Sequence, residues 1–510
     1  MNNEINILFS YIRRVLSAQI LSVFALFFAN GLCPAALVAQ EIIFSRAQQL
    51  SNRADEYDLC GRTNDEGIII HSWGDNYSQI EAYDEATLAR KWAKPVFFER
   101  KRKTKMRNVS VFGDNALLLT YTLKASKMNY LYVRITDSRL NPLTNDVLLD
   151  SIRTTINSPS YRIEVSLSPD RKLALISRHN FEFNNIISTA NIIIDQELHV
   201  LLRRKYVFDN KKTFFQEFID NSGQLTTLSV QAKNTMANDD SNMQIEALYL
   251  EVANAYNDRK ISIEKNDVYL TDFRVASDLR NRRIVLAGFY NEKKAAKRSK
   301  GYFYGYIDQQ SDTLSYYTMQ PFQPDLLKQA GNSLLVAKDQ LANLKTINML
   351  VRQDGGILLM SESAYSTRQT APRSNFDGFS GRQFAQITNF YNNDIVLLSI
   401  NPDGSELWSK ILPKRQYSED DNAYYSSFAA LNDRTAMYLF FNEEIRNSTN
   451  VAFGQVDAIG NYKISVMRNT GQNSNILLAP RYAKQLWPNA LLVPGFNNKN
   501  EFLIAKILIK

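Results

Sequence analysis

The sequence predicts an all-β fold made from a repeated four-stranded unit, and three observations support this prediction. Short runs rich in Val, Ile, Leu, Tyr and Phe recur along the 510 residues, separated by turns rich in Asp, Asn and Gly. The runs group into fours, as in residues 108–151, 213–263 and 424–467. The last group, which starts near residue 475, contains only three runs. Four antiparallel strands repeated every ~50 residues are typical of a β-propeller, in which each unit is one blade.

The spacing of the units is nearly constant apart from two insertions. Units begin near residues 56, 108, 162, 213, 268, 346, 424 and 475, so the steps are 51–55 residues except for two steps of 78. The first insertion, residues 322–344, predicts a short amphipathic helix from the spacing of five side chains, Leu334, Leu335, Lys338, Leu341 and Leu344. The second, residues 364–393, is polar and rich in Ser, Arg, Asn and Gly, and predicts a long loop.

The unit count predicts eight blades, with seven as the alternative. The final unit, which begins at Ile476, lacks a fourth strand, and we expect Glu41–Arg46 to supply it and close the ring. A closed ring leaves no exposed sheet edge between the first and last blades. A pair of β-sandwiches does not predict a three-stranded ending matched by a spare N-terminal strand, and a β-helix has coils much shorter than ~50 residues.

The N-terminus predicts export. Two arginines precede the apolar run Ile20–Phe28, and small residues then lead to Ala39. A basic region, a short apolar region and a small-residue cleavage site are typical of a secretory signal peptide, here residues 1–39. The apolar run is shorter than the ~20 residues that span a bilayer, which favours a cleaved signal over a transmembrane anchor. We expect residues 40–510 to form a single propeller domain with no transmembrane span.

The repeat resembles the superfamily of WD40-like and PQQ-like repeat propellers over essentially the whole exported chain. Ile400–Trp408 is similar to the turn followed by Trp in PQQ-type repeats, whereas the Gly-His and Trp-Asp dipeptides of WD40 blades are absent. The Val-Ala-Gln-Glu end of the signal is similar to that of exported proteins of Bacteroidota. The export signal and this resemblance imply a location in the periplasm or on the outer-membrane surface.

Histidine and cysteine are scarce, which argues against several chemistries. Three His and two Cys are too few for a zinc cluster or a disulfide framework, and no phosphate-binding loop, dinucleotide fingerprint or nucleophile elbow occurs. The sequence therefore predicts no metal and no cofactor. We expect His71 to be a buried imidazole on the same strand face as Trp73, and Cys60 to pack as an apolar residue. His179 and His199 are not expected to form a site.

The candidate catalytic residues are acidic side chains in the predicted first strand of four units. These strands line the axis of a propeller, so the acids are expected around a central channel: Asp58, Glu164, Glu217 and Asp272. Such carboxylates can act as general acid and base on a sugar, as in propeller glycosidases, or can simply line a hydrated channel. The first possibility gives the alternative function, a carbohydrate-active enzyme (glycosidase or lyase).

The candidate binding surface consists of basic loops on one face of the ring. With the four strands of a blade named a to d from the axis outward, the loop between strands b and c and the loop from strand d to the next blade share one face of a propeller. Both insertions and two basic runs are assigned to this face. The predicted binding residues are Arg100, Lys101, Arg102, Lys103, Lys105, Lys293, Lys294, Lys297 and Arg298. Clusters of Lys and Arg favour an anionic partner.

The leading functional hypothesis is a non-enzymatic scaffold that binds protein or glycan partners in the cell envelope. It rests on the lack of a catalytic motif and on the concentration of loop insertions on one face. The expected partner is an envelope protein or an anionic glycan, and the export signal argues against nucleic acid. No oligomeric state follows from the sequence.

Overall fold

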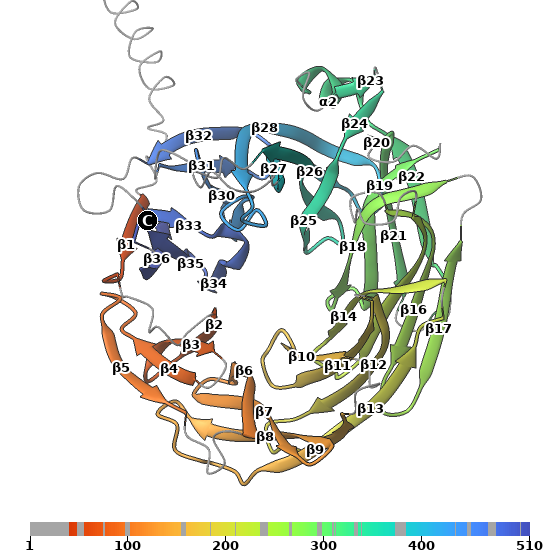
Figure 1. The fold of residues 1–510 in the computed structure, drawn as a ribbon. Helices are drawn as coiled ribbons and strands as arrows, with labels where there is room; N and C mark the ends of the chain where they lie inside the picture. The colour runs from red at the N-terminus through yellow and green to blue at the C-terminus, as the bar shows by residue number, and fades with distance from the viewer. Residues whose placement is uncertain are drawn as a thin grey trace, which may run out of the picture.

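The structure is a computed structural model in which the described part of the chain is almost entirely β-structure. It describes residues 40–509 except 48–55, 75–76, 97–102, 155–159, 184, 210, 235–242, 265–267, 293–297, 309–310, 312, 331–334, 338, 373–383, 434, 446–449, 468–475 and 500. Antiparallel sheets follow one another around a central opening (Figure 1), which is a propeller-like arrangement. The all-β prediction is therefore confirmed. The predicted signal peptide lies outside the described residues.

The first half of the ring contains four antiparallel sets of four strands. The first set is β2 (Glu56–Thr63), β3 (Gly67–Gly74), β4 (Tyr77–Tyr83) and β5 (Arg90–Pro95). The second is β6 (Thr104–Phe112), β7 (Ala116–Ala125), β8 (Met128–Asp137) and β9 (Val147–Arg153). The third is β10 (Ser160–Leu167), β11 (Ala174–Glu182), β12 (Asn185–Ile194) and β13 (Val200–Val207). The fourth is β14 (Lys212–Ile219), β15 (Leu225–Asn234), β16 (Met243–Ala253) and β17 (Asp258–Glu264).

The second half continues this order. One strand set is β18 (Tyr269–Asp278), β19 (Arg283–Asn291), β21 (Gly301–Asp308) and β22 (Tyr316–Pro321). The next is β25 (Leu344–Val351), β26 (Ile357–Pro372), β27 (Phe384–Ile400) and β28 (Glu406–Glu419). It is followed by β29 (Ala429–Asn432), β30 (Met437–Asn442), β31 (Val451–Val456) and β32 (Tyr462–Met467). The pairing of Ile245 with Leu270 joins β16 to β18, so β14–β22 form one continuous sheet.

The last sheet combines strands from both ends of the described chain. It contains β33 (Ile476–Leu478), β34 (Lys484–Trp487), β35 (Ala490–Asn497), β36 (Phe502–Ile509) and β1 (Gln40–Phe44). β1 runs antiparallel to β36, from Gln40 opposite Ile509 to Phe44 opposite Ala505. Ile42 and Phe44 pack against the buried cluster that contains Ile507.

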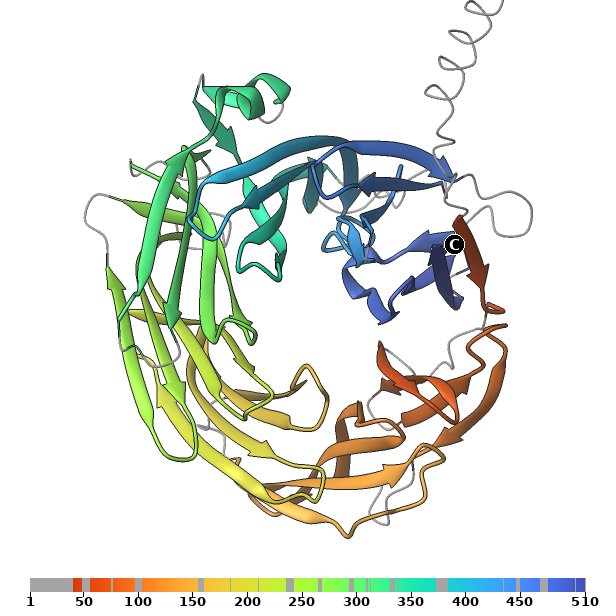
Figure 2. The same cartoon turned by 180° about the vertical axis from the view of Figure 1, so that it is seen from behind.

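Strand position within each sheet explains its composition. The first strands, such as β2, β6, β10, β18 and β25, border the central opening, and the last strands lie at the rim (Figures 1 and 2). Middle strands are covered by neighbouring sheets on both faces and are almost continuously apolar, as in the buried run Ile284–Asn291 of β19. The rim strand β5 is mostly exposed and carries Arg90, Lys91 and Lys94.

The predicted helix in residues 322–344 was placed on the wrong residues. The helix is α2 (Pro324–Gln329), which begins at a proline and buries Leu326. It is followed by β23 (Leu335–Ala337) and β24 (Gln340–Ala342), which form a small sheet with β20 (Arg298–Ser299). Leu335 and Leu341 are paired across this hairpin, so a spacing that resembled one face of a helix arises from a tight turn.

The long loop predicted for residues 364–393 was also wrong in its described part. β26 and β27 continue as a paired hairpin as far as Pro372 and Phe384. Three tyrosines pair across this extension: the rings of Tyr365 and Tyr391 are stacked with centroids 4.7 Å apart, and those of Tyr391 and Tyr417 are 5.2 Å apart. Cross-strand aromatic pairs of this kind stabilise a hairpin that carries many polar residues.

Candidate functional site

A cavity of about 520 Å³, here called the axial cavity, lies beside the central opening. Its walls come from β18, β25, β29 and the last sheet. Three cationic side chains line it, Arg274, Lys345 and Arg481, and none of the described residues in its lining is acidic. Its volume lies within the ~300–1,000 Å³ typical of small-ligand sites.

Two neighbouring first strands position the first two cations. Arg274 of β18 donates a hydrogen bond from Nη2 to the Thr346 carbonyl oxygen of β25 at 2.9 Å. The Thr346 backbone N–H donates in return to the carboxylate of Asp272. Burial raises the pKa of Asp272 above its usual value, although the Thr346 N–H, Arg274 and Lys345 all oppose this shift.

An interruption of the innermost strand of the last sheet positions the third cation. The sequence predicts one strand over Ile476–Ala483, but the structure divides it into β33, the 3₁₀ helix η4 (Pro480–Tyr482) and β34. Pro480 has no N–H to donate to the ladder, which accounts for the break. The turn places Arg481 in the cavity wall, where 31% of its side chain is exposed.

A buried ion pair lies directly behind Arg481. Glu362 of β26 and Lys414 of β28 are 2.8 Å apart, and both side chains are 0% exposed. Lys414 Nζ also donates to the Asn392 carbonyl and to Gln416 Oε1, while Asn392 Nδ2 donates to Glu362 Oε1 at 2.7 Å. Burial lowers the pKa of Lys414 despite the attraction of Glu362.

Glu362 connects this buried pair to the cavity, because its Oε1 lies 3.9 Å from Arg481 Nη2. The carboxylate therefore faces two cations and helps to orient the one that reaches solvent. Sequence reasoning missed Glu362 and Lys414. Glu362 follows the apolar run Ile357–Met360 of β26, and Lys414 lies in β28, beyond the loop that the sequence predicts over residues 364–393. Only the register of β26, β27 and β28 brings the two side chains together.

The four sequence-predicted acids lie in the first strands β2, β10, β14 and β18, but each already has a partner. Asp58 accepts from Lys484 Nζ at 3.1 Å. Glu164 pairs with Arg162 at 2.5 Å. Asp272 accepts from Thr346, as described above. Only Glu164 and Glu217 are brought to one place, where both approach a third side chain.

That third side chain is His179, which the sequence analysis set aside. It is 1% exposed; its Nε2 lies 2.8 Å from Glu217 Oε1 and its Nδ1 lies 3.8 Å from Glu164 Oε2. Asn191 Nδ2 donates to the other oxygen of Glu217 at 2.8 Å. The His179–Glu217 contact joins β11 to β14 of the next sheet, and no sequence spacing indicates it.

The expectations for His71 and Cys60 are confirmed. His71 is buried, its ring stacks on Trp73 with centroids 4.7 Å apart, and its Nε2 is 3.0 Å from Ser78 Oγ. Burial lowers the pKa of His71 to about 3, so the ring is neutral at physiological pH. Cys60 packs in the core, where burial raises its thiol pKa well above the usual value.

Asp195, Glu197 and His199 form the one described group whose ligand atoms lie close enough together to hold a metal ion. They occupy the turn between β12 and β13. Asp195 Oδ1 accepts the backbone N–H groups of Glu197 and His199 at 3.0 and 2.8 Å, which is the ordinary bonding of an Asx turn. Turn geometry therefore accounts for this group.

Of the predicted basic binding residues, three are described: Lys103, Lys105 and Arg298. All three are exposed, but Lys105 lies within β6 and Arg298 within β20, so neither belongs to a loop. The others, Arg100, Lys101, Arg102, Lys293, Lys294 and Lys297, lie outside the described residues.

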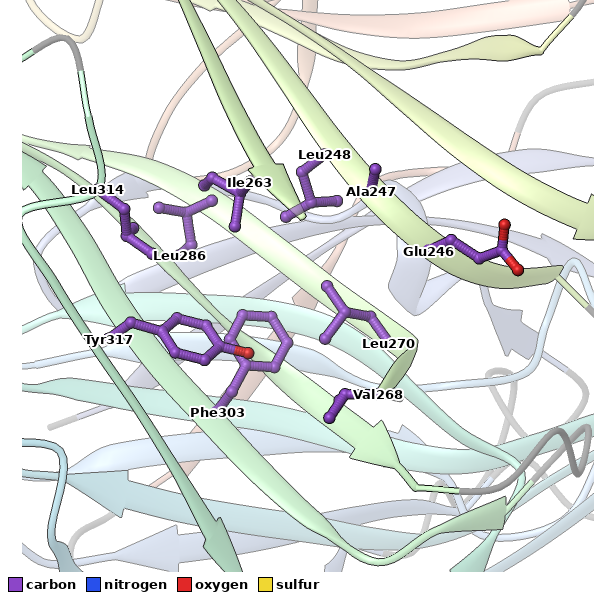
Figure 3. A pocket seen from close by; sticks show the side chains of 10 residues that line it. All are labelled: Glu246, Ala247, Leu248, Ile263, Val268, Leu270, Leu286, Phe303, Leu314 and Tyr317. Atoms are coloured by element: carbon purple, nitrogen blue, oxygen red, sulfur yellow. The ribbon is translucent and has the colours of Figure 1, made fainter. Parts of the chain in front are cut away.

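A second cavity, shown in Figure 3, is a packing defect between the two strand sets of the continuous sheet β14–β22. It has a volume of about 20 Å³ and is lined mainly by apolar side chains, including Leu270, Leu286, Phe303 and Tyr317. This volume holds about one water molecule, and an apolar site of that size binds water poorly. The axial cavity is therefore the candidate functional site.

Comparison with known proteins gives likenesses to solved structures but no match in sequence. No protein-family model and no curated protein matches the sequence. Similar solved structures include the propeller of Dos1, with 9% identity, 91% of this chain and 95% of that chain covered, and a TM-score of 0.43. A Bacteroides caccae protein of unknown function has 10% identity, with 73% and 94% covered and a TM-score of 0.26. The dihydro-heme d1 dehydrogenase NirN has 9% identity, with 92% of this chain and 78% of that chain covered and a TM-score of 0.36.

These likenesses accompany a propeller-like fold and carry no statement about activity, since they include both an enzyme and a protein of unknown function. The fold and the axial cavity define the class: a propeller-like protein with a cationic site beside its central opening. None of the described helices is long and apolar enough to cross a membrane.

Proposed function

We propose that this protein is an exported, non-enzymatic binding propeller of the periplasm or outer-membrane surface, and that its partner presents anionic groups. The partner is an acidic glycan or the acidic surface of an envelope protein. The observation that carries the proposal is the axial cavity, lined by Arg274, Lys345 and Arg481 and by no acidic side chain of the part of the chain that the structure describes. A concave site lined by positive charges concentrates anions, because it focuses the electrostatic field.

We also propose that the ring has eight blades and that β1 closes it. The strand sets described above support this count when the continuous sheet β14–β22 is taken as two blades joined by one pairing. The antiparallel ladder between β1 and β36 supports the closure.

The alternative function, a carbohydrate-active enzyme, has one observation in its favour: Glu164 and Glu217 approach opposite nitrogens of His179. Against it, Asp58 and Asp272 are engaged with partners in other sheets. Glycan cleavage by the wild type that Glu217→Gln and Asp272→Asn both abolish would establish the enzyme and overturn the binding role.

Calorimetric titration at low ionic strength tests the binding proposal. The probes are a galacturonate oligosaccharide, poly-glutamate and, as a neutral control, a maltose oligosaccharide. We expect the wild type to bind at least one anionic probe, and Arg274→Gln, Lys345→Gln and Arg481→Gln each to weaken that binding about tenfold. Lys463→Gln, a matched loss of charge on the exposed side of β32, should leave the affinity unchanged.

The predicted basic loops are the competing binding surface, and one further variant separates the two. In it, Ser replaces Arg100, Lys101, Arg102, Lys103, Lys293, Lys294, Lys297 and Arg298. Undiminished binding by this variant supports the axial cavity. Loss of binding here, together with full binding by a triple cavity variant, would move the site to the loops.

A further inference from the structure

We infer that the partner is a chain of acidic pyranose sugars, held by an aromatic subsite beside the axial cavity, an inference that rests on the proposed anion binding. The subsite is formed by Tyr482 and Tyr424. It names the class of ligand, because a ring face next to a cation recognises a sugar carboxylate in a way that a cation alone does not.

The interruption of the inner strand puts the cation and the aromatic ring on consecutive residues of one turn at the cavity wall. Tyr482 follows Arg481 directly in η4, and it is 51% exposed. Its ring lies 4.8 Å from that of Tyr424, with an angle of 31° between the planes. Because Tyr424 covers one side of the Tyr482 ring, the exposed half of the residue leaves the other side accessible to a ligand.

A packed group of aromatic residues holds Tyr424 in place. Its ring contacts those of Tyr425 at 5.0 Å and Phe496 at 6.1 Å, both nearly edge-on. Phe496 in turn contacts Tyr57, whose ring stacks on Phe502 at 4.2 Å. Tyr482 is thus the outermost ring of a rigid aromatic cluster, and a ligand that packs on it loses little side-chain entropy.

The loop that carries Tyr424 is strained. Between β28 and β29, four residues other than glycine have left-handed backbone conformations: Asp420, Asn422, Ala423 and Ser427, with φ of 51°, 53°, 55° and 77°. Conformations of this kind are unfavourable for most residue types, although Asp and Asn tolerate them, and they cluster at ligand-binding segments. Side-chain hydrogen bonds maintain the loop: Asp421 Oδ1 accepts from the Ala423 N–H and from Ser418 Oγ.

The chemistry of these groups fits a uronic acid. A pyranose ring presents a flat face of C–H groups that packs on an aromatic ring, and its hydroxyls need hydrogen-bonding groups around that ring. Arg481 supplies a guanidinium for the carboxylate, and Asn348, which also lines the cavity, supplies an amide. An acidic peptide has the same use for the cations but no requirement for the exposed face of Tyr482.

Titration of the full chain with the galacturonate oligosaccharide and with poly-glutamate tests the inference. We expect Tyr482→Ala and Tyr482→Leu to weaken galacturonate binding about tenfold and to leave poly-glutamate binding unchanged, while Tyr482→Phe binds like the wild type. Tyr256→Ala is the matched control, because Tyr256 is 98% exposed in the turn between β16 and β17. Tyr482→Leu keeps the apolar volume and so remains informative if Tyr482→Ala is unstable.

The outcomes separate the two proposals. Equal galacturonate affinity in the wild type and Tyr482→Leu overturns the sugar subsite. If Arg481→Gln weakens poly-glutamate binding while galacturonate does not bind, the anion-binding function stands and the sugar class is wrong. If the wild type binds neither anionic probe, the proposed function fails, and the inference fails with it.

Discussion

Glu362 and Lys414 hold opposite charges where water does not reach, since both side chains are 0% exposed. Removing charges from water costs several kcal/mol per ion, and the attraction between them offsets this only when further hydrogen bonds are made. Asn392 and Gln416 supply those bonds. Such a pair adds little net stability, so its value lies in what it orients, and the group within its reach is Arg481.

Glu362→Gln should lower the free energy of unfolding by about 3–5 kcal/mol, because it leaves Lys414 buried without a counter-charge. Urea unfolding measures the change. The double variant Glu362→Leu/Lys414→Met should recover most of the loss, since it removes both charges together. Equal stability of Glu362→Gln and the wild type would contradict the ion pair.

Contacts between residues of different sheets could not be predicted from sequence patterns. Glu217 and Asp272 could be assigned to inner strands because strand order within a repeat is regular. Their partners could not be found, because His179 meets Glu217 across the boundary between two sheets. The three cavity cations come from separate sheets, and their convergence depends on the curvature of the whole ring.

At the scale of elements, the strands were predictable and the insertions were not. Middle strands such as β19 are nearly continuous apolar runs, which single-sequence patterns identify well. In short segments between blades, the spacing of apolar residues fits a helix as well as a hairpin. Leu335 and Leu341, which are paired in a hairpin, therefore have a spacing that resembles one face of a helix. The polar composition of residues 364–393 concealed a hairpin whose order comes from three paired tyrosines.

Shortening that hairpin should leave the ring intact. Arg368 and Thr388 are paired across β26 and β27, so replacing residues 369–387 by Asn-Gly joins them through a two-residue turn. The removed tip adds no residue to the buried clusters of the described structure. We expect the melting temperature measured by calorimetry to stay within about 2 °C of the wild type. A larger fall would show that the tip contributes to the core.

At the scale of the whole molecule, the core is divided among the interfaces between sheets. One cluster contains Leu248 of β16 and Phe273 of β18, and another contains Leu359 of β26 and Tyr302 of β21. Each strand set therefore depends on its neighbours for burial, and removal of a strand that packs in one of these clusters exposes apolar surface.

Deleting β1 should consequently destabilise the molecule. A chain that starts at residue 45 loses the packing of Ile42 and Phe44 and the ladder to β36, and we expect unfolding to become easier by about 3 kcal/mol relative to a chain that starts at residue 40. Differential scanning calorimetry of the two chains makes the comparison. Identical melting temperatures would refute closure by this strand.

The ladder between residues 40 and 509 also has a kinetic consequence. Contacts between distant parts of a chain form slowly, because the intervening segment must first be ordered at an entropic cost. β1, the first of the described strands along the chain, must therefore wait for β36, the last of them. Until they meet, β1 and β36 are unpaired edges that invite pairing with other chains. Under the export proposed above, the chain meets this delay after it has crossed the membrane, so its yield should depend on how well these two edges are shielded while it folds.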